Sequence, residues 1–362
     1  MTYKTKRFLW ARWQRLKRWE FWPVWAVYPP VLASVVWHGI RLRGLTLWTN
    51  CNPAMEASGM ALEAKGGILD SFGGPAGRVR LARYLRIEAG AEDAFQQVKG
   101  FMKERGLEYP VVFKPDFGQR GQGVEIVKNE KAAKCWMENC QEGFLVQELI
   151  TGLEFGVHWS KYPDEEKGMI ASLCGKHPQF VRGDGERTLE RLILDDDRAV
   201  LMARYYFCKF VGSLGKVLER NERFTLAPIG THARGAVFTD ERSLITDELR
   251  EVFDELGARF PGFNHGRYDV KVPSVENLQA GRNIVVLELN GVMGEHAHIY
   301  QPGYPWWKGV RDLCGQFRRA AEVGAAWRAK GVQPPEPGDL LDLIRRHCEK
   351  DYLEVDEFER NH

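Results

Sequence analysis

Two acidic residues and an asparagine have the types and spacing of magnesium ligands. Asp269 lies in the run Gly266-Arg267-Tyr268-Asp269-Val270, and Glu288 and Asn290 lie about twenty residues later in Val285 to Gly291. Both runs read as strands that could pair as neighbours, and period-2 alternation puts Glu288 and Asn290 on one face. Such a set suits Mg²⁺, which binds a few protein carboxylates together with water and nucleotide phosphates. Scattered surface acids are the alternative, but acids inside apolar strands need a partner when buried.

Arg267 precedes Asp269 by two positions, so the same alternation puts its guanidinium beside the acidic residues. A fixed cation at that point can neutralise a γ-phosphoryl group during transfer. The pattern therefore indicates a phosphoryl-transfer site.

A second run, Val111-Val112-Phe113-Lys114-Pro115, predicts a strand that ends close to a lysine, and Gly118, Gly121 and Gly123 follow it. The lysine places a cation at the end of a sheet, and a glycine hairpin can lay backbone N–H groups over phosphates. A plain β-turn has the same composition, so this run alone does not identify a nucleotide site.

A third run, Phe144 to Val157, predicts a strand that leaves into a short loop. The loop offers backbone groups to an adenine edge, and Glu154 could accept hydrogen bonds from ribose hydroxyls. An ordinary strand–turn–strand with surface glutamates remains the alternative for this run.

These residues need strands and helices to position them. Glycine-divided runs rich in apolar and β-branched residues predict strands at 109–115, 123–127, 144–150, 155–160, 169–175, 266–272 and 283–289. Helices are predicted at 92–105, 188–204, 247–256 and 339–350. The alternation of strands and helices indicates an α+β or α/β class.

Composition excludes several classes of protein. The 362 residues are 44% hydrophobic and 28% charged, which is typical of a globular chain with two domains or one composite domain. The net charge of +2 argues against a nucleic-acid-binding protein. Seven scattered cysteines without a CxxC pair indicate reduced thiols in a cytoplasmic protein rather than disulfides or a zinc site. We find no signal-peptide pattern, and we expect the mature chain to begin at Met1.

The order and spacing of the three runs resemble the ATP-grasp ligases of the D-alanine–D-alanine ligase and cyanophycin-synthetase type, over Lys65 to about Pro302. The resemblance implies an ATP-grasp fold, in which two α/β lobes clamp ATP with Mg²⁺ or Mn²⁺. For the nucleotide, it implies phosphate contacts by Lys65 and Lys114 and a phosphate-covering loop at Gly118, Gly121 and Gly123. It also implies an adenine hinge at Gln147, Glu148, Leu149 and Ile150 and a ribose contact by Glu154. For the reaction, it implies metal ligation by Asp269, Glu288 and Asn290 and a transition-state contact by Arg267.

Two more segments resemble the same family. Val181 to Leu189 is similar to its GDG-x-x-T-[IL] element, in which Thr188 would cap a helix. Arg234 lies where the family has a glycine-rich segment near the γ-phosphate, so we expect it to contact an anionic group, with a solvated loop arginine as the alternative. The roles of His232, Glu295 and His296 are left open.

The resemblance implies that a carboxylate is activated as an acyl phosphate and joined to an amine, with release of ADP. Two alternatives are a nucleotide-binding module without turnover, and a carboxylate–thiol ligase or kinase-like phosphoryl transfer. Family members commonly carry a preceding α/β domain that helps to build the substrate pocket, whereas only 113 residues precede Lys114 here. Neither the small-molecule or lipid-linked substrates nor the oligomeric state can be identified from the sequence.

The first 48 residues have a composition of their own, with seven of the twelve tryptophans and many cations. Apolar side chains fall on one broad helical sector, namely Phe8, Leu9, Trp13, Leu16 and Trp19. Arg7, Arg15 and Arg18 lie off it, although Arg12 intrudes. Tryptophan and arginine together favour the lipid headgroup layer, so we predict a peripheral element on the inner face of an anionic membrane that serves an amphiphilic substrate. Packing on the catalytic body is the alternative.

Residues 21–40 carry no charged side chain, but three prolines and His38 argue against a membrane span. We therefore divide the chain into an aromatic and basic segment (1–48), a reduced linker region (49–108), an ATP-grasp catalytic domain (109–330), and a C-terminal helix with an acidic tail (331–362).

Overall fold

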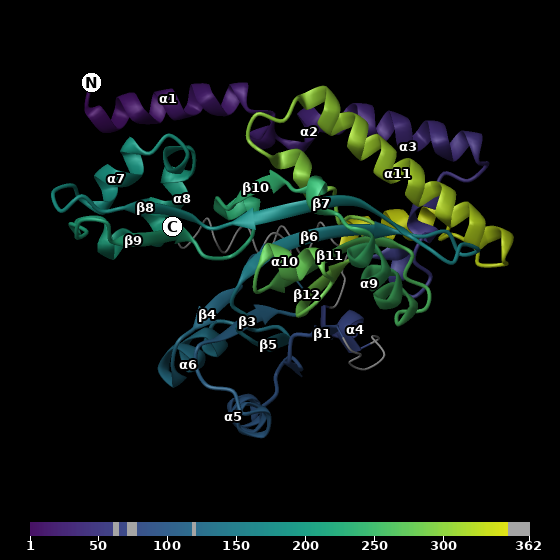
Figure 1. Cartoon of the computed structure of the whole chain (residues 1–362), viewed down its shortest axis with the longest axis horizontal. Coiled ribbons are helices and arrows are strands. Elements are labelled where there is room, and N and C mark those ends of the chain that lie inside the picture. The colour runs from purple at the N-terminus through teal and green to yellow at the C-terminus, as the bar shows by residue number, and fades with distance from the viewer. Residues whose placement is uncertain (61–64, 71–77, 118–120, 347–362) are drawn as a thin grey trace.

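The structure is a computed structural model that describes residues 1–60, 65–70, 78–117 and 121–346 (Figure 1). It is a mixed α+β fold, as predicted, and its largest element is a six-stranded sheet. In spatial order the strands are β1 (Val79–Leu81), β12 (Ile284–Asn290), β11 (His265–Val272), β6 (Leu153–Ser160), β7 (Met169–His177) and β10 (Val237–Asp240). β1 runs parallel to β12, and the other neighbours are antiparallel.

The two faces of this sheet differ in polarity because side chains alternate along each strand. One face packs against α9 (Asp247–Ala258) and α10 (Val275–Gln279) and forms a core that includes Trp159, Leu173 and Tyr268. The expected helix at 247–256 is confirmed, and it begins where the Thr246 side chain accepts a hydrogen bond from the Leu249 N–H. The opposite face carries the charged side chains of the candidate site.

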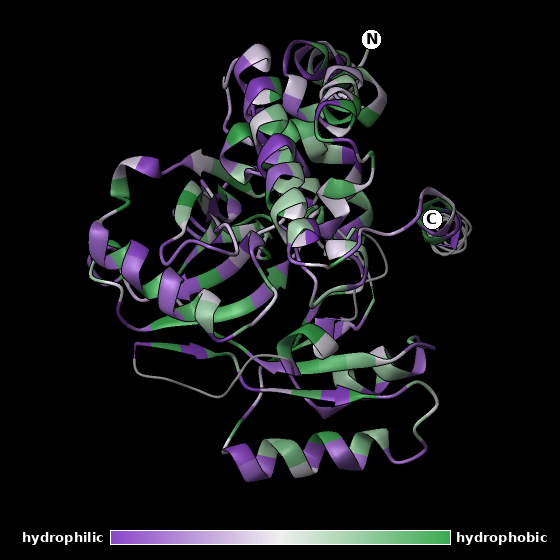
Figure 2. Cartoon of the chain, turned by 90° about the vertical axis from the view of Figure 1, so that its right-hand side faces the viewer, coloured by the Kyte–Doolittle hydropathy of each residue, from purple (hydrophilic) through white to green (hydrophobic). Residues whose placement is uncertain are grey.

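A smaller lobe contains a four-stranded sheet, in the order β2 (Tyr84–Ile87), β5 (Phe144–Glu148), β3 (Val111–Pro115) and β4 (Glu125–Val127). Its core packs beneath α5 (Ala94–Arg105) and α6 (Glu130–Glu138). Hydrophobic and hydrophilic residues alternate along α5, the helix at the bottom of Figure 2, as expected for an amphipathic helix. The structure confirms the predicted helix at 92–105 and the strands at 109–115, 123–127 and 144–150.

A third unit consists of β8 (Gln179–Arg182), β9 (Arg223–Ala227), α7 (Leu189–Asp195) and α8 (Ala203–Lys209). Thr188 caps α7, as expected, by accepting a hydrogen bond from the Arg191 N–H. The prediction of one helix over 188–204 is wrong. Asp196 is extended, and its carboxylate accepts hydrogen bonds from the N–H groups of Arg198 and Ala199, so a new helical turn starts there.

Helices α1 (Tyr3–Lys17), α2 (Val24–Val27), α3 (Pro29–Arg41) and α11 (Trp306–Ala329) line one edge of the molecule, at the top of Figure 1. Phe317 of α11 and Val31 of α3 share a core with Cys51 and Met60. α4 (Lys65–Asp70) lies beside β12. Residues 337–346 are helical, as expected. None of the helices in the described ranges is long and apolar enough to cross a membrane.

Candidate nucleotide and metal site

The predicted metal ligands meet on the polar face of the large sheet. β11 pairs with β12 so that Asp269 lies opposite Glu288 and Arg267 lies opposite Asn290. The Asn290 Nδ2 lies 3.5 Å from the Asp269 Oδ2, and the Arg267 Nε donates to the Asp269 Oδ1 at 2.9 Å. The four side chains that the sequence grouped are thus neighbours, and their pairing is the one that alternation required.

A β-bulge beside these residues connects the two sheets. The register shifts after Asp269, which leaves Leu287 as the extra residue on β12. Its carbonyl accepts hydrogen bonds from the Lys114 Nζ at 3.3 Å and from the Gln147 Nε2 at 3.1 Å. The bulge therefore brings the lysine of the small lobe to the acidic residues of the large sheet.

The ammonium group of Lys114 is buried, and its hydrogen-bond acceptors are uncharged. Besides the Leu287 carbonyl, its Nζ donates to the Gln147 Oε1 at 3.2 Å, and within the described ranges no carboxylate lies at ion-pair distance. Burial lowers the pKa of Lys114, Glu288 partly offsets this, and the nearby Lys65 lowers it further. A buried cation without a contacting anion is costly, so the arrangement fits a phosphate group.

Lys176 is a site residue that sequence reasoning missed. It extends from β7 to Asp269, with 2.9 Å between Nζ and Oδ2, and lies 3.5 Å from the Glu154 Oε1. Burial alone would lower its pKa, but Asp269 and Glu154 outweigh burial and raise it. The available signal was period 2 along β7, where Ser172, Cys174 and Lys176 alternate with apolar residues.

Asp269 lies between two cations. Burial opposes its ionisation, but Arg267 and Lys176 lower the pKa of the carboxyl well below its usual range. Asp269 is therefore ionised and able to ligate a cation. Gly156 lies opposite it on β6, and a Cβ there would stand 3.1 Å from the Arg267 Cδ and 3.4 Å from the Asp269 Oδ1, so the glycine makes room for the charged groups.

The predicted adenine and ribose contacts lie where β5 of the small sheet leads into β6 of the large sheet. The Glu148 carboxylate is held by Arg80 and by the side chain and backbone of Arg83, so this side chain positions the hinge and only backbone groups remain for a base. The Ile150 carbonyl accepts from the Lys271 Nζ at 2.9 Å, and Leu149 between them is half-buried. The Glu154 carboxylate lies against Gly230, where a Cβ would stand 2.1 Å from Oε1.

The predicted glycine hairpin lies beside Arg234, which the sequence indicated as a contact for an anionic group. Gly118 is outside the described residues, whereas Gly121 and Gly123 have φ of +75° and +66°, a left-handed conformation that favours glycine. The Arg234 Nη1 donates to the Val124 carbonyl at 3.2 Å, and the Cβ position of Gly121 is 2.9 Å from the Thr231 Oγ1. Arg234 is thus packed on the hairpin rather than extended into solvent.

We expect this hairpin to become protected from amide hydrogen exchange when MgATP binds, because loops that cover phosphates close over them. A peptide that spans residues 118–124 should exchange more slowly with MgATP than without it, whereas one from β9 should not change. Equal protection of the hairpin in both states would contradict the expected role.

A cluster of buried histidines continues the polar face beyond Arg267. The His158 ring centroid lies 4.6 Å from that of His265 and 4.3 Å from that of His296. Within the part of the chain that the structure describes, both ring nitrogens of His158 and the Nε2 atoms of His265 and His296 have no hydrogen-bond partner. Burial lowers the pKa of all three, so the rings are neutral. Buried polar atoms are nearly always satisfied by protein, by water or by a ligand, so these nitrogens are available to a water molecule or to a polar group of a ligand.

Glu295 lies beside this cluster and differs from an exposed glutamate. Burial raises the pKa of its carboxyl to about 6, although the Tyr300 hydroxyl, which donates to it at 2.5 Å, acts in the opposite direction. The sequence left Glu295 and His296 without a role, since only the tertiary structure brings them to His158.

The donor set fits Mg²⁺ rather than a soft metal. Among the residues that the structure describes, no three His, Cys, Asp or Glu side chains form a self-contained metal cage. Two carboxylates and an amide oxygen instead match a cation that completes its octahedron with phosphates and water. Asp269, Glu288 and Asn290 are the residues that would hold it.

No protein-family model matches the sequence, and a search of curated proteins finds no match. Solved structures that resemble the chain include the D-alanine–D-alanine ligase from Coxiella burnetii, with 12% sequence identity over 80% of this chain and 62% of that chain and a TM-score of 0.40. The VanG D-Ala:D-Ser ligase from Enterococcus faecalis has 15% identity over 66% of this chain and 57% of its own, with a TM-score of 0.37. A bifunctional glutathione synthetase from Pasteurella multocida has 14% identity over 64% of this chain and 33% of its own, with a TM-score of 0.32. The chain spans less than two thirds of the length of each, and likeness at this level does not transfer an activity to it. By name, they include the ligases that the sequence runs resemble.

Proposed function

We propose that the chain is an ATP-dependent ligase of the ATP-grasp type, which activates a carboxylate as an acyl phosphate and transfers it to an amine. The observation that carries this proposal is the meeting of Lys114 from the small sheet with Asp269, Glu288 and Asn290 from the large one. Phosphate-binding cations and hard oxygen ligands on facing sheets are what phosphoryl transfer from MgATP requires.

The residues present could bind each part of the nucleotide. Lys114 and Lys65 would contact the phosphates, Glu154 the ribose hydroxyls, and the backbone at Glu148 to Ile150 the adenine edge. The metal, when bound, supplies charge neutralisation at the β- and γ-phosphates. Lys176 holds Asp269 and Glu154 at fixed separation and so links the ribose end to the metal end.

The reaction needs no covalent bond to the protein. A carboxylate oxygen of the substrate attacks the γ-phosphorus, the bond to the bridging oxygen breaks, and ADP leaves. The amine nitrogen then attacks the acyl carbon, phosphate departs, and the nitrogen loses its proton. Arg267, whose guanidinium contacts Asp269, would lie beside the reacting groups and stabilise the oxyanion that forms at the acyl carbon.

The acceptor would bind beyond Arg267, where the histidine cluster and Glu295 lie. Two aromatic residues of the N-terminal segment pack close to this region. The Trp19 ring lies 5.7 Å from that of Tyr300, which donates to Glu295, and the Phe21 ring lies 5.5 Å from that of His232. Aromatic side chains beside polar groups suit an amphiphilic substrate, and we include such a substrate in the proposal.

Turnover assays distinguish this proposal from a binding module. ADP release should depend on both a carboxylate and an amine, measured over panels of each with the purified chain. If the chain binds MgATP but releases no ADP with any carboxylate–amine pair, a nucleotide-binding module is favoured. If ADP release requires a thiol in place of the amine, a carboxylate–thiol ligase is favoured. Failure to bind MgATP would exclude all of these.

Replacing Lys114 with methionine should weaken ATP binding by about tenfold or more, because the ammonium contacts phosphate already in the ground state. Methionine is of similar length, which limits the loss of packing. Isothermal titration calorimetry with ATP measures the effect, and Lys131→Met on the exposed side of α6 is the matched control. Unchanged ATP affinity in Lys114→Met would contradict the phosphate contact.

A further inference from the structure

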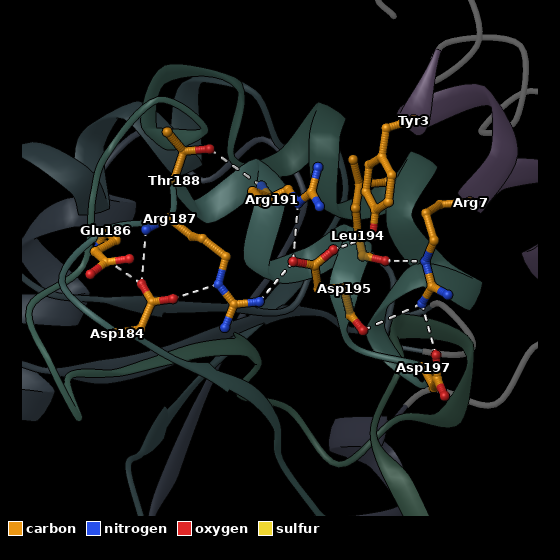
Figure 3. A network of polar contacts seen from close by, with 10 residues as sticks. All are labelled: Tyr3, Arg7, Asp184, Glu186, Arg187, Thr188, Arg191, Leu194, Asp195 and Asp197. Atoms are coloured by element: carbon orange, nitrogen blue, oxygen red, sulfur yellow. Dashed lines mark hydrogen bonds and ion pairs between the residues drawn. The ribbon is translucent and has the colours of Figure 1, made fainter. Parts of the chain in front are cut away.

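Helix α1 is held on the protein body by Phe8, Trp10 and Ala11, which pack into the core of the third unit, and by a row of polar contacts. Lys4 pairs with Glu190 at 2.6 Å, the Arg7 Nε donates to the Leu194 carbonyl at 2.5 Å, and the Arg15 Nη1 donates to the Leu201 carbonyl at 3.0 Å. Figure 3 shows Tyr3 and Arg7 reaching Leu194 and Asp195 in the last turn of α7 and Asp197 just beyond it. These contacts fix which side of α1 faces outward.

The outward side of α1 is apolar. Leu9, Trp13 and Leu16 are exposed, whereas Phe8 packs against Phe207 and Trp19 is buried. The single apolar sector expected from the sequence is therefore divided between the body and the surface. A helix on the surface of a globular protein ordinarily turns its polar side to water, whereas α1 also exposes three large apolar side chains there.

Helix α3 has the same feature and continues it along the same edge of the molecule, at the top of Figures 1 and 2. Val31 and Gly39 are buried towards the body. On the opposite side Leu32, Val36, Trp37 and Ile40 are exposed. Its polar side chains are only those of Ser34, His38 and Arg41, so α3 carries large apolar side chains on its outward side as well as on the side that faces the body. Such a helix is typically covered on more than one side.

Exposed cations flank both apolar faces. Lys6, Arg12 and Lys17 lie on α1, and Arg41 and Arg43 lie at the end of α3. Tryptophan and leucine side chains bordered by lysine and arginine match the headgroup boundary of an anionic bilayer. Most of the large exposed hydrophobic side chains in the described ranges belong to the first 45 residues, so the pattern is local.

We propose that the outward faces of α1 and α3 form a docking surface for an anionic lipid bilayer, in which both helices lie in the plane of the headgroups. The charge favours this occupant over a second copy of the chain, because a two-fold contact would bring the same row of cations from both copies together. The proposal is independent of the ligase reaction, since it concerns residues outside the site.

Co-sedimentation of the full chain with vesicles tests it. The vesicles are equimolar phosphatidylcholine and phosphatidylserine, with phosphatidylcholine alone as the second arm. Trp13→Glu and Trp37→Glu change side chains that are 56% and 64% exposed, so the fold should survive. Val211→Glu and Leu341→Glu are matched controls, at positions 76% and 66% exposed but outside the proposed surface.

The chain should pellet with the anionic vesicles and bind phosphatidylcholine much more weakly. Each tryptophan variant should lower partitioning by about tenfold or more, because it removes a ring that would be buried in the bilayer and adds a charge that anionic lipid repels. The controls should match the unsubstituted chain. Equal loss in the controls, or no pelleting with anionic vesicles, would overturn the proposal. A lipid-free dimer that the tryptophan variants dissociate would assign the surface to a second copy instead.

Discussion

Replacing Glu288 with glutamine should lower kcat by about a thousandfold while leaving the fold intact, because several kcal/mol of metal-mediated charge stabilisation are lost at the reacting phosphate. Glutamine keeps the size of the side chain. Glu288 is half-buried at the end of β12, so the neutral amide should be accommodated there. The measurements are ADP release at saturating substrates and the thermal unfolding midpoint.

Asp269→Asn should reduce turnover to a similar degree but should also destabilise the fold. Its carboxylate is the partner of both Arg267 and Lys176, and removing one member of a buried ion pair costs about 3–5 kcal/mol. Glu276→Gln on α10 is the control for both variants, because it also replaces a carboxylate with an amide, at a position remote from the site. Near-normal ADP release from Glu288→Gln would remove the metal assignment.

The grouping of Asp269, Glu288 and Asn290 could be predicted because it depends on local order within two strands. Alternation puts Glu288 and Asn290 on one side of β12, and the neighbouring strand supplies Arg267 and Asp269 at matching positions. The bulge at Leu287 was not predictable, although it turns a carbonyl towards Lys114. Strand pairing is encoded by pattern, whereas a bulge depends on how the two lobes meet.

Lys176 and the histidine cluster show where sequence reasoning stops. Lys176 belongs to the site because β7 pairs with β6, which places it opposite Glu154. His158, His265 and His296 come from separate segments, and no spacing in the sequence links them. The direction of α1 was also not predictable, because its partners Glu190, Leu194 and Leu201 lie far along the chain. In each case the tertiary contact decides the role.

Arg267→Ala should lower kcat by about a hundredfold to a thousandfold, with little change in ATP affinity, because the guanidinium acts on charge that develops in the transition state. Lys271 provides a matched control on the same strand. It lies four residues further along β11, where its Nζ donates to the Ile150 carbonyl at the adenine end. Lys271→Ala should therefore weaken ATP binding and change kcat less.

The two variants together separate the effect of position from that of lost charge, since each removes one cation from the same face of β11. Arg267→Lys refines the comparison: it keeps the charge but loses the paired N–H groups that contact Asp269 at 2.9 and 3.3 Å, so it should recover part of the rate and not all of it. Thermal unfolding of each variant controls for the loss of the Asp269 contact. Two results would contradict this role of Arg267. One is a reduction of ATP affinity and kcat by equal factors in Arg267→Ala, and the other is a loss of kcat in Lys271→Ala as strong as that in Arg267→Ala. Either result would mean that the acyl-transfer end of the site lies elsewhere on this face of the sheet.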